Sequence, residues 1–176
     1  MRLFVAIDLP EHIKDYLELV KREFSRYLLA KWVKRENIHL TIKFLGEVKD
    51  EFVSELVKRL ERIEIKPFKL CIDSIGVFPS ERFARVLWAG FDTSNKLVDL
   101  RRQIDLELPF GDEKEFKAHA TIARIKRIKD KKGFVEKLRE FKIERLCFEV
   151  KNFVLYKSTL TSEGPIYEVV REFALS

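Results

Sequence analysis

Hydrophobic positions along this chain change between strand-like and helix-like spacing, and so predict strands and helices in turn. Residues 2–8 form a continuous apolar run that is typical of a buried strand. Pro10 comes next, at a favourable place for a helix start. Apolar residues then recur at helical spacing, namely Ile13, Tyr16, Leu17, Val20 and Phe24. The pattern therefore predicts a strand followed by an amphipathic helix.

The first half of the chain continues with a strand at 38–45, which ends at Gly46, and a helix that begins at about Asp50. This helix carries its apolar face on Phe52, Leu56, Val57, Leu60 and Ile63. Strands at 68–78 and 83–91 follow, joined by a turn around Pro79. The predicted order is β-α-β-α-β-β.

The second half repeats much of this plan. Either Thr93 or Ser94 is placed to cap a helix whose apolar face includes Leu97 and Ile104. The later elements are a strand at 118–125, a helix at 130–141 and two strands at 147–156 and 166–173. Both halves therefore place one central strand between two helices.

The spacing of two markers supports an internal duplication. His39 and His119 are 119 − 39 = 80 positions apart, while the Leu-Cys pairs that end at Cys71 and Cys147 are 147 − 71 = 76 apart. A difference of four residues fits one repeated unit with small loop changes.

We expect an α+β fold of two duplicated β-α-β-α-β-β units that are related by a pseudo-two-fold axis. Their antiparallel sheets would face a central cleft. No linker or low-complexity tract separates the units, so we predict one domain over 1–176, with approximate lobes 1–82 and 83–176 that pack closely.

The most informative feature is a repeated tripeptide, His39-Leu40-Thr41 and His119-Ala120-Thr121. Residues two apart on a strand share one face, so each tripeptide presents an imidazole beside a hydroxyl. A single histidine on an apolar strand is usually a packed or edge residue. Two such histidines at matching places in a duplicated chain favour a shared functional site, because unpaired buried imidazoles are costly.

Such a site suits a phosphate ester. One histidine can remove a proton from the attacking oxygen and the other can protonate the leaving oxygen near neutral pH. The hydroxyls of Thr41 and Thr121 would donate to the non-bridging oxygens. Lys43 is expected on the histidine face from its spacing, whereas Arg124 would need a strand end or a bulge to reach it.

Other chemistry has weaker support. Zinc ligation would need a third ligand at a suitable spacing, for which Asp8 and Asp73 are candidates only by assumption. The chain has no Gly-x-Ser-x-Gly sequence and no Gly-rich phosphate loop. We interpret His12 as an exposed residue without a catalytic role. Trp32 and Trp88 could line the cleft, but their spacing favours core packing. No metal or cofactor is expected.

The net charge of +6 favours a polyanionic partner such as nucleic acid. No run approaches the roughly 18 apolar residues of a membrane span, so we expect a cytoplasmic protein. Cys71 and Cys147 are accordingly interpreted as buried free thiols. Abundant Lys, Arg and Glu with a single glutamine, Gln103, suggest a thermostable protein.

The sequences Ile38-His39-Leu40-Thr41-Ile42-Lys43-Phe44-Leu45-Gly46-Glu47-Val48 and Ala118-His119-Ala120-Thr121-Ile122-Ala123-Arg124 resemble the paired signatures of the two-histidine (2H) phosphoesterases. Within that superfamily the chain is most similar to the RNA 2′,3′-cyclic phosphodiesterases, also called 2′-5′ RNA ligases. The resemblance extends to 2–10, to 85–90 and to 164–168. Relatives often have proline before the second histidine, where this chain has Ala118.

The resemblance implies a bilobal fold and metal-independent hydrolysis of a terminal cyclic phosphate to a 2′-phosphomonoester, with 2′-5′ joining of RNA ends as a related reaction. By position, His39 would be the general acid and His119 the general base. Thr41 and Thr121 would hold the phosphate, and Arg124 fills the family's arginine position.

The expected partner is therefore an RNA end bearing a 2′,3′-cyclic phosphate. We expect the protein to act on it as a monomer. Two alternatives stay open at this point. A 2H relative could act on a different cyclic phosphate, or the chain could be a non-catalytic RNA-binding module. The sequence has no RNP1-type aromatic run to support the second alternative.

Overall fold

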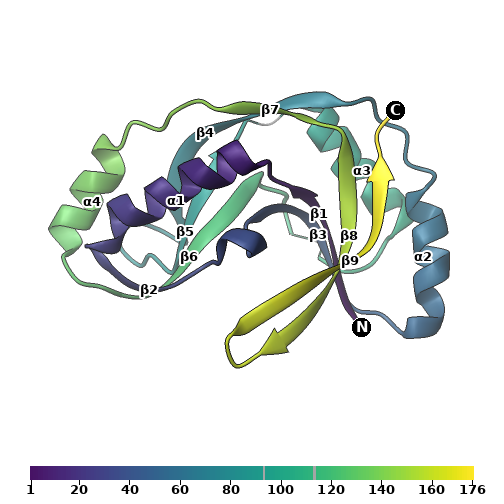
Figure 1. Ribbon diagram of the computed structural model, residues 1–176, viewed down its shortest axis with the longest axis horizontal. Helices are drawn as coiled ribbons and strands as arrows, with labels where there is room; N and C mark the ends of the chain where they lie inside the picture. Colours follow the sequence, from purple (N-terminus) through teal and green to yellow (C-terminus); the bar gives the residue numbers. More distant parts are fainter. Residues whose placement is uncertain (93, 113) are drawn as a thin grey trace.

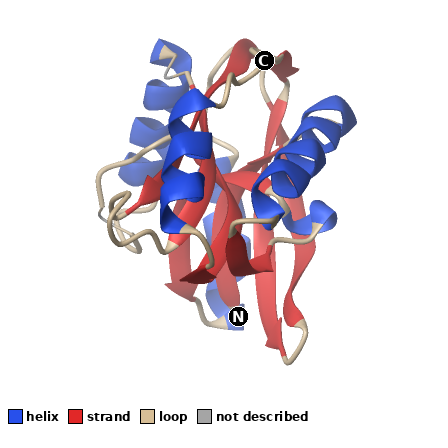
Figure 2. Cartoon of the chain, turned by 90° about the vertical axis from the view of Figure 1, so that its left-hand side faces the viewer, coloured by secondary structure: helices blue, strands red, loops and turns tan. Residues whose placement is uncertain are grey.

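The computed structural model describes residues 1–92, 94–112 and 114–176. Its strands form two antiparallel sheets, and helices lie outside them (Figures 1 and 2). The strands are β1 (Arg2–Asp8), β2 (Leu28–Trp32), β3 (His39–Glu47), β4 (Phe68–Phe78), β5 (Val86–Phe91), β6 (His119–Ile128), β7 (Cys147–Val150), β8 (Asn152–Thr161) and β9 (Gly164–Ala174). The α-helices are α1 (Glu11–Ser25), α2 (Val53–Leu60), α3 (Asn95–Glu107) and α4 (Lys131–Glu140), with short 3-10 turns at Arg35–Asn37 and Asp50–Phe52.

The predicted α+β class and duplicated architecture are confirmed by the order of the strands. One sheet has the order β3-β1-β8-β9 and the other the order β2-β6-β5-β4-β7. The series β3-β1-β8-β9 corresponds to β6-β5-β4-β7, which is the pseudo-two-fold relation expected from the repeated sequence. Each half contributes two strands to the sheet of the other half: β2 and β4 flank the pair β6-β5, while β8 and β9 extend the sheet beyond β1. The two halves therefore interlock.

The helices bury one face of each sheet. Helix α1 packs on β2 and β6, and α3 packs on β3. The predicted apolar face of α1 is confirmed, since Ile13, Leu17, Val20 and Phe24 are fully buried. Ser94 caps α3 by accepting a hydrogen bond from the backbone of Leu97, while Thr93 lies outside the described residues. No helix of the described chain is long and apolar enough to cross a membrane.

Two local predictions are wrong. The hydrophobic pattern does not predict strand β2, because this strand follows α1 without a glycine or proline to mark the boundary. The cysteines are not free thiols, because Cys71 and Cys147 form a disulfide. The two Leu-Cys pairs suggest that the cysteines hold equivalent positions, but the sheet order makes β4 the counterpart of β8. Strands β4 and β7 are paired neighbours, and the two cysteines lie directly opposite each other. The repeat spacing does not reveal this long-range pairing.

Candidate functional site

The two His-x-Thr tripeptides occupy equivalent places in the two sheets. His39 is the first residue of β3 and His119 the first residue of β6, and each strand pairs with the first strand of its own half, β1 or β5. Thr41 and Thr121 follow on the same face as their histidines, and all four side chains are partly exposed. Strands β3 and β6 contact each other across the two sheets. The fold thus brings both tripeptides to the place where the sheets meet.

Both strands contain the same irregularity directly after the threonine. The pairing register shifts so that Ile42 in β3 and Ile122 in β6 are extra residues. A bulge of this kind reverses which side chains point to which face. Beyond it, Arg124 is exposed on the histidine face, whereas Lys43 and Ala123 turn toward the core. The bulge is the feature that Arg124 needed to reach the site.

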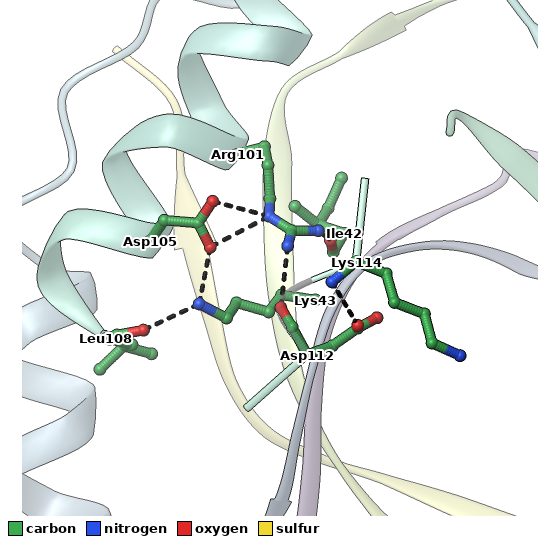
Figure 3. Close-up of polar contacts among 7 residues, drawn as sticks. All are labelled: Ile42, Lys43, Arg101, Asp105, Leu108, Asp112 and Lys114. Carbon is green, nitrogen blue, oxygen red and sulfur yellow. Dashed lines mark hydrogen bonds and ion pairs between the residues drawn. The ribbon is translucent and has the colours of Figure 1, made fainter. Parts of the chain in front are cut away.

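Lys43 does not lie on the histidine face, and the expectation from its spacing is wrong. Its side chain is only 4% exposed. Its ammonium group donates to Asp105 Oδ1 at 2.6 Å and to the carbonyl of Leu108 at 2.9 Å (Figure 3). These partners lie on and after α3, on the side of the sheet away from His39. Lys43 is therefore not a phosphate ligand.

Instead, Lys43 belongs to a polar network that holds the bulge in place. Asp105 also accepts from Arg101 Nε at 3.0 and 3.1 Å (Figure 3). Arg101 donates in turn to the carbonyls of Ile42 at 2.7 Å and Asp112 at 3.0 Å. Burial raises the pKa of Asp105, but the hydrogen bonds from Lys43 and Arg101 outweigh it and bring the pKa below its usual value.

Replacing Asp105 with asparagine should therefore destabilise the fold. The change leaves the buried cations of Lys43 and Arg101 without a counter-charge, and we expect a loss of about 2–3 kcal/mol, because Asp105 itself is partly exposed. Urea unfolding measures this value. Asp99→Asn is the matched control, since its carboxylate pairs with the exposed Arg102 on the same helix and should cost less than about 0.5 kcal/mol. Equal losses in the two variants would contradict a structural role for the network.

His119 is held in a defined tautomer. Its Nδ1 lies 2.7 Å from the carbonyl oxygen of Lys117. Because a carbonyl only accepts hydrogen bonds, Nδ1 must carry the proton, and Nε2 of the neutral ring is left as the basic atom. The ring meets Phe78 edge-on at 5.2 Å and Trp88 at 6.4 Å. Trp88 thus lies beside the histidine on the site face, which is the alternative to core packing that its sequence position left open.

His39 is packed among aromatic rings. It stacks on Phe4 at 4.9 Å and meets Tyr167 edge-on at 5.1 Å. Burial lowers the pKa of His39 from 6.5 to about 4, although a backbone hydrogen bond with Asn37 and the charge of Asp8 oppose this change. The free protein therefore holds His39 neutral at neutral pH.

This low pKa predicts a pH-dependent stability. The unfolded chain binds a proton at His39 at higher pH than the folded chain does, so stability falls as the pH drops from 6.5 through about 4. The contribution of His39 to this loss is about 3 kcal/mol. We expect urea unfolding of His39→Gln to lack this part of the pH dependence. His12→Gln, which changes an exposed histidine, should keep it. A wild-type profile that matches His39→Gln between pH 4 and 7 would contradict the burial argument.

Charged side chains of both sheets act on Tyr167. Burial raises the pKa of this phenol, and the positive charges of Arg124 and Arg2 oppose the rise. Tyr167 of β9 contacts His39, so the charge of Arg124 from the other sheet acts close to the first histidine. Within residues 1–92, 94–112 and 114–176, no three His, Cys, Asp or Glu side chains are grouped closely enough to hold a metal ion.

The structure places the predicted histidines, threonines and Arg124 on site-facing surfaces of β3 and β6, and adds aromatic walls of which the sequence suggested only Trp88. Phe4 and Tyr167 enclose His39, and Phe78 and Trp88 enclose His119. Their alternation on strands is visible in the sequence, yet it is equally typical of core packing. Only the strand pairing shows which face they share.

Comparisons with known proteins agree with this geometry. The family model for LigT-like phosphoesterases matches residues 7–88 and 92–167. An RNA 2′,3′-cyclic phosphodiesterase of Methanocaldococcus jannaschii is 41% identical and covers 98% of this chain and 100% of its own length. One of Aquifex aeolicus is 38% identical, with coverage of 99% and 97%.

Solved structures give the same result. A protein of Thermus thermophilus matches with a TM-score of 0.83 at 27% identity, covering 99% of this chain and 98% of that chain. The E. coli LigT complex with 3′-AMP matches with a TM-score of 0.78 at 26% identity, with the same coverage. The family match spans both His-x-Thr strands and the interlocked sheets that carry them, and the chain belongs to the LigT-like phosphoesterase family.

Proposed function

We propose that this protein hydrolyses the 2′,3′-cyclic phosphate at RNA 3′ ends to a 2′-phosphomonoester, and that residues 1–176 act as one cytoplasmic, monomeric domain. The observation that carries the proposal is that β3 and β6, which contact each other across the two sheets, each present an imidazole and a hydroxyl on one face. The bulge that follows each threonine adds Arg124 to the same face. The relatives named RNA 2′,3′-cyclic phosphodiesterase, alike over nearly their full lengths, support the choice of substrate.

His119 is proposed as the general base. Its Nε2 is the free basic atom, because Nδ1 donates to Lys117. It would take a proton from water as the water oxygen attacks phosphorus. The bond from phosphorus to the 3′ oxygen then breaks and leaves the phosphate on the 2′ oxygen.

His39 is proposed as the general acid that protonates the departing 3′ oxygen. A pKa of about 4 leaves it neutral in the free protein, so it must acquire its proton when substrate binds. The negative charge of the bound phosphate favours the imidazolium form, and this is why His39 gains a proton when substrate binds. Thr41, Thr121 and Arg124 are proposed to donate to the non-bridging oxygens, whose charge is stabilised as the bonds change.

The test uses a short RNA that ends in a 2′,3′-cyclic phosphate. We expect conversion to a 2′-phosphate, resolved by chromatography against 2′- and 3′-phosphate standards. A second RNA with a 5′-hydroxyl end reports 2′-5′ joining, which should be slower because water is in large excess. Binding of this RNA without any turnover would favour a non-catalytic RNA-binding module. If the protein hydrolysed only cyclic phosphates that are not part of an RNA, it would be a 2H relative with a different substrate.

A further inference from the structure

Lys31 lies on the unexpected strand β2, directly opposite Arg124 of β6. Both side chains are exposed. Directly opposed residues of an antiparallel pair share a face, with Cβ atoms about 5 Å apart. Lys31 therefore extends the face that carries His119, Thr121 and Arg124.

This pair of like charges has no acidic partner within residues 1–92, 94–112 and 114–176. None of the ion pairs among the described residues involves Lys31 or Arg124. Like charges directly opposite each other destabilise a sheet. A bound anion would remove that cost, so the pair indicates an anion site that extends beyond Arg124.

The side chain of Lys31 is directed toward the opposite sheet. A Cβ atom placed on Gly164, at the start of β9, would be 4.0 Å from Lys31 Nζ. The same part of β9 is fastened to the first half of the chain, because Asn37 Nδ2 donates to the carbonyl of Pro165 at 3.0 Å. Lys31 thus points to the strand that begins three residues before Tyr167, the ring that covers His39. Its charge lies at the edge of the proposed site.

We propose that Lys31 binds the phosphodiester group immediately 5′ to the terminal nucleoside of the RNA. This inference rests on the proposed function and adds a specificity residue to it. Arg124 faces the terminal phosphate, and the next cation along the same face is placed for the next phosphate. A flexible lysine suits this role, because an ammonium acts as a point charge without a fixed fork geometry. A free cyclic mononucleotide has no such phosphate, so Lys31 makes the protein selective for RNA ends.

The test compares adenosine 2′,3′-cyclic phosphate with the dinucleotide ApA that ends in the same group. Lys31→Gln should lower kcat/KM for the dinucleotide by about tenfold, as expected for one charge-assisted contact, and should change the mononucleotide value less than twofold. The slope of log(kcat/KM) against log salt for the dinucleotide should become about 0.7 less negative. Lys132→Gln is the matched control, since Lys132 is exposed on α4, at the far left of Figure 1.

Equal losses with both substrates, or no loss with either, would overturn the role of Lys31. If wild-type protein turned over neither substrate, the proposed function would fail separately. The role of Lys31 is then tested by binding alone, with the dissociation constants of adenosine 2′-phosphate and of ApA with a terminal 2′-phosphate. Lys31→Gln should weaken only the dinucleotide, and equal weakening of both ligands would again overturn the inference.

Discussion

Replacing His119 with alanine is expected to lower kcat/KM for RNA ending in a 2′,3′-cyclic phosphate by about 10³-fold. The reason is local, because the hydrogen bond from Nδ1 to Lys117 leaves Nε2 as the one basic atom of the ring. Without the imidazole, water must attack phosphorus with no group in place to take its proton. Initial rates on a short RNA substrate measure the loss.

His39→Ala should reduce kcat/KM by a similar factor, since the 3′ oxygen is a poor leaving group unless it is protonated. His12→Ala serves as the control for both variants, because His12 is exposed on α1, where its ring lies within hydrogen-bonding distance of the carbonyl of Cys147. It should keep at least half of the wild-type rate. Loss of only a few-fold in either His39→Ala or His119→Ala would contradict the assigned roles.

Reduction of the disulfide is the second large expected effect. Cys71 and Cys147 close a loop across a sequence separation of 76, and the loss of a cross-link of this span costs roughly 4 kcal/mol. We expect the urea midpoint of wild-type protein to fall when a reductant is added. Intracellular disulfides are rare in mesophiles but common in hyperthermophiles, which agrees with the charge-rich, glutamine-poor composition.

The double variant Cys71→Ser with Cys147→Ser is the control for this experiment. It should unfold at the reduced wild-type midpoint and show no response to the reductant. A wild-type midpoint that is the same with and without the reductant would show that the cross-link contributes nothing to stability.

The sequence predicted which side chains share a strand face better than it predicted which strands become neighbours. Period-2 alternation placed His39 beside Thr41 and His119 beside Thr121, because that rule is local and needs no knowledge of neighbouring strands. The same rule failed at Lys43, where one extra residue, Ile42, reverses the faces. Nothing in the local sequence marks this bulge.

Long-range pairing accounts for the other failures. The two Leu-Cys pairs suggest equivalent positions for Cys71 and Cys147, yet in the folded chain β4 corresponds to β8, and β4 pairs with β7. Strand β2 is short and follows α1 directly, so the hydrophobic pattern assigns Lys31 to no element. In both cases the decisive information is which strands become neighbours, and the hydrophobic pattern of one chain does not specify it.

The central claim is that two histidines cleave a cyclic phosphate without a metal ion, and ³¹P NMR of the reaction in excess EDTA tests it most directly. Wild-type protein should convert the cyclic-phosphate signal of a short RNA entirely into a 2′-phosphomonoester at an undiminished rate. The double variant His39→Ala with His119→Ala should leave the signal unchanged. A 3′-phosphate product, abolition of the reaction by EDTA, or continued turnover by the double variant would contradict the account.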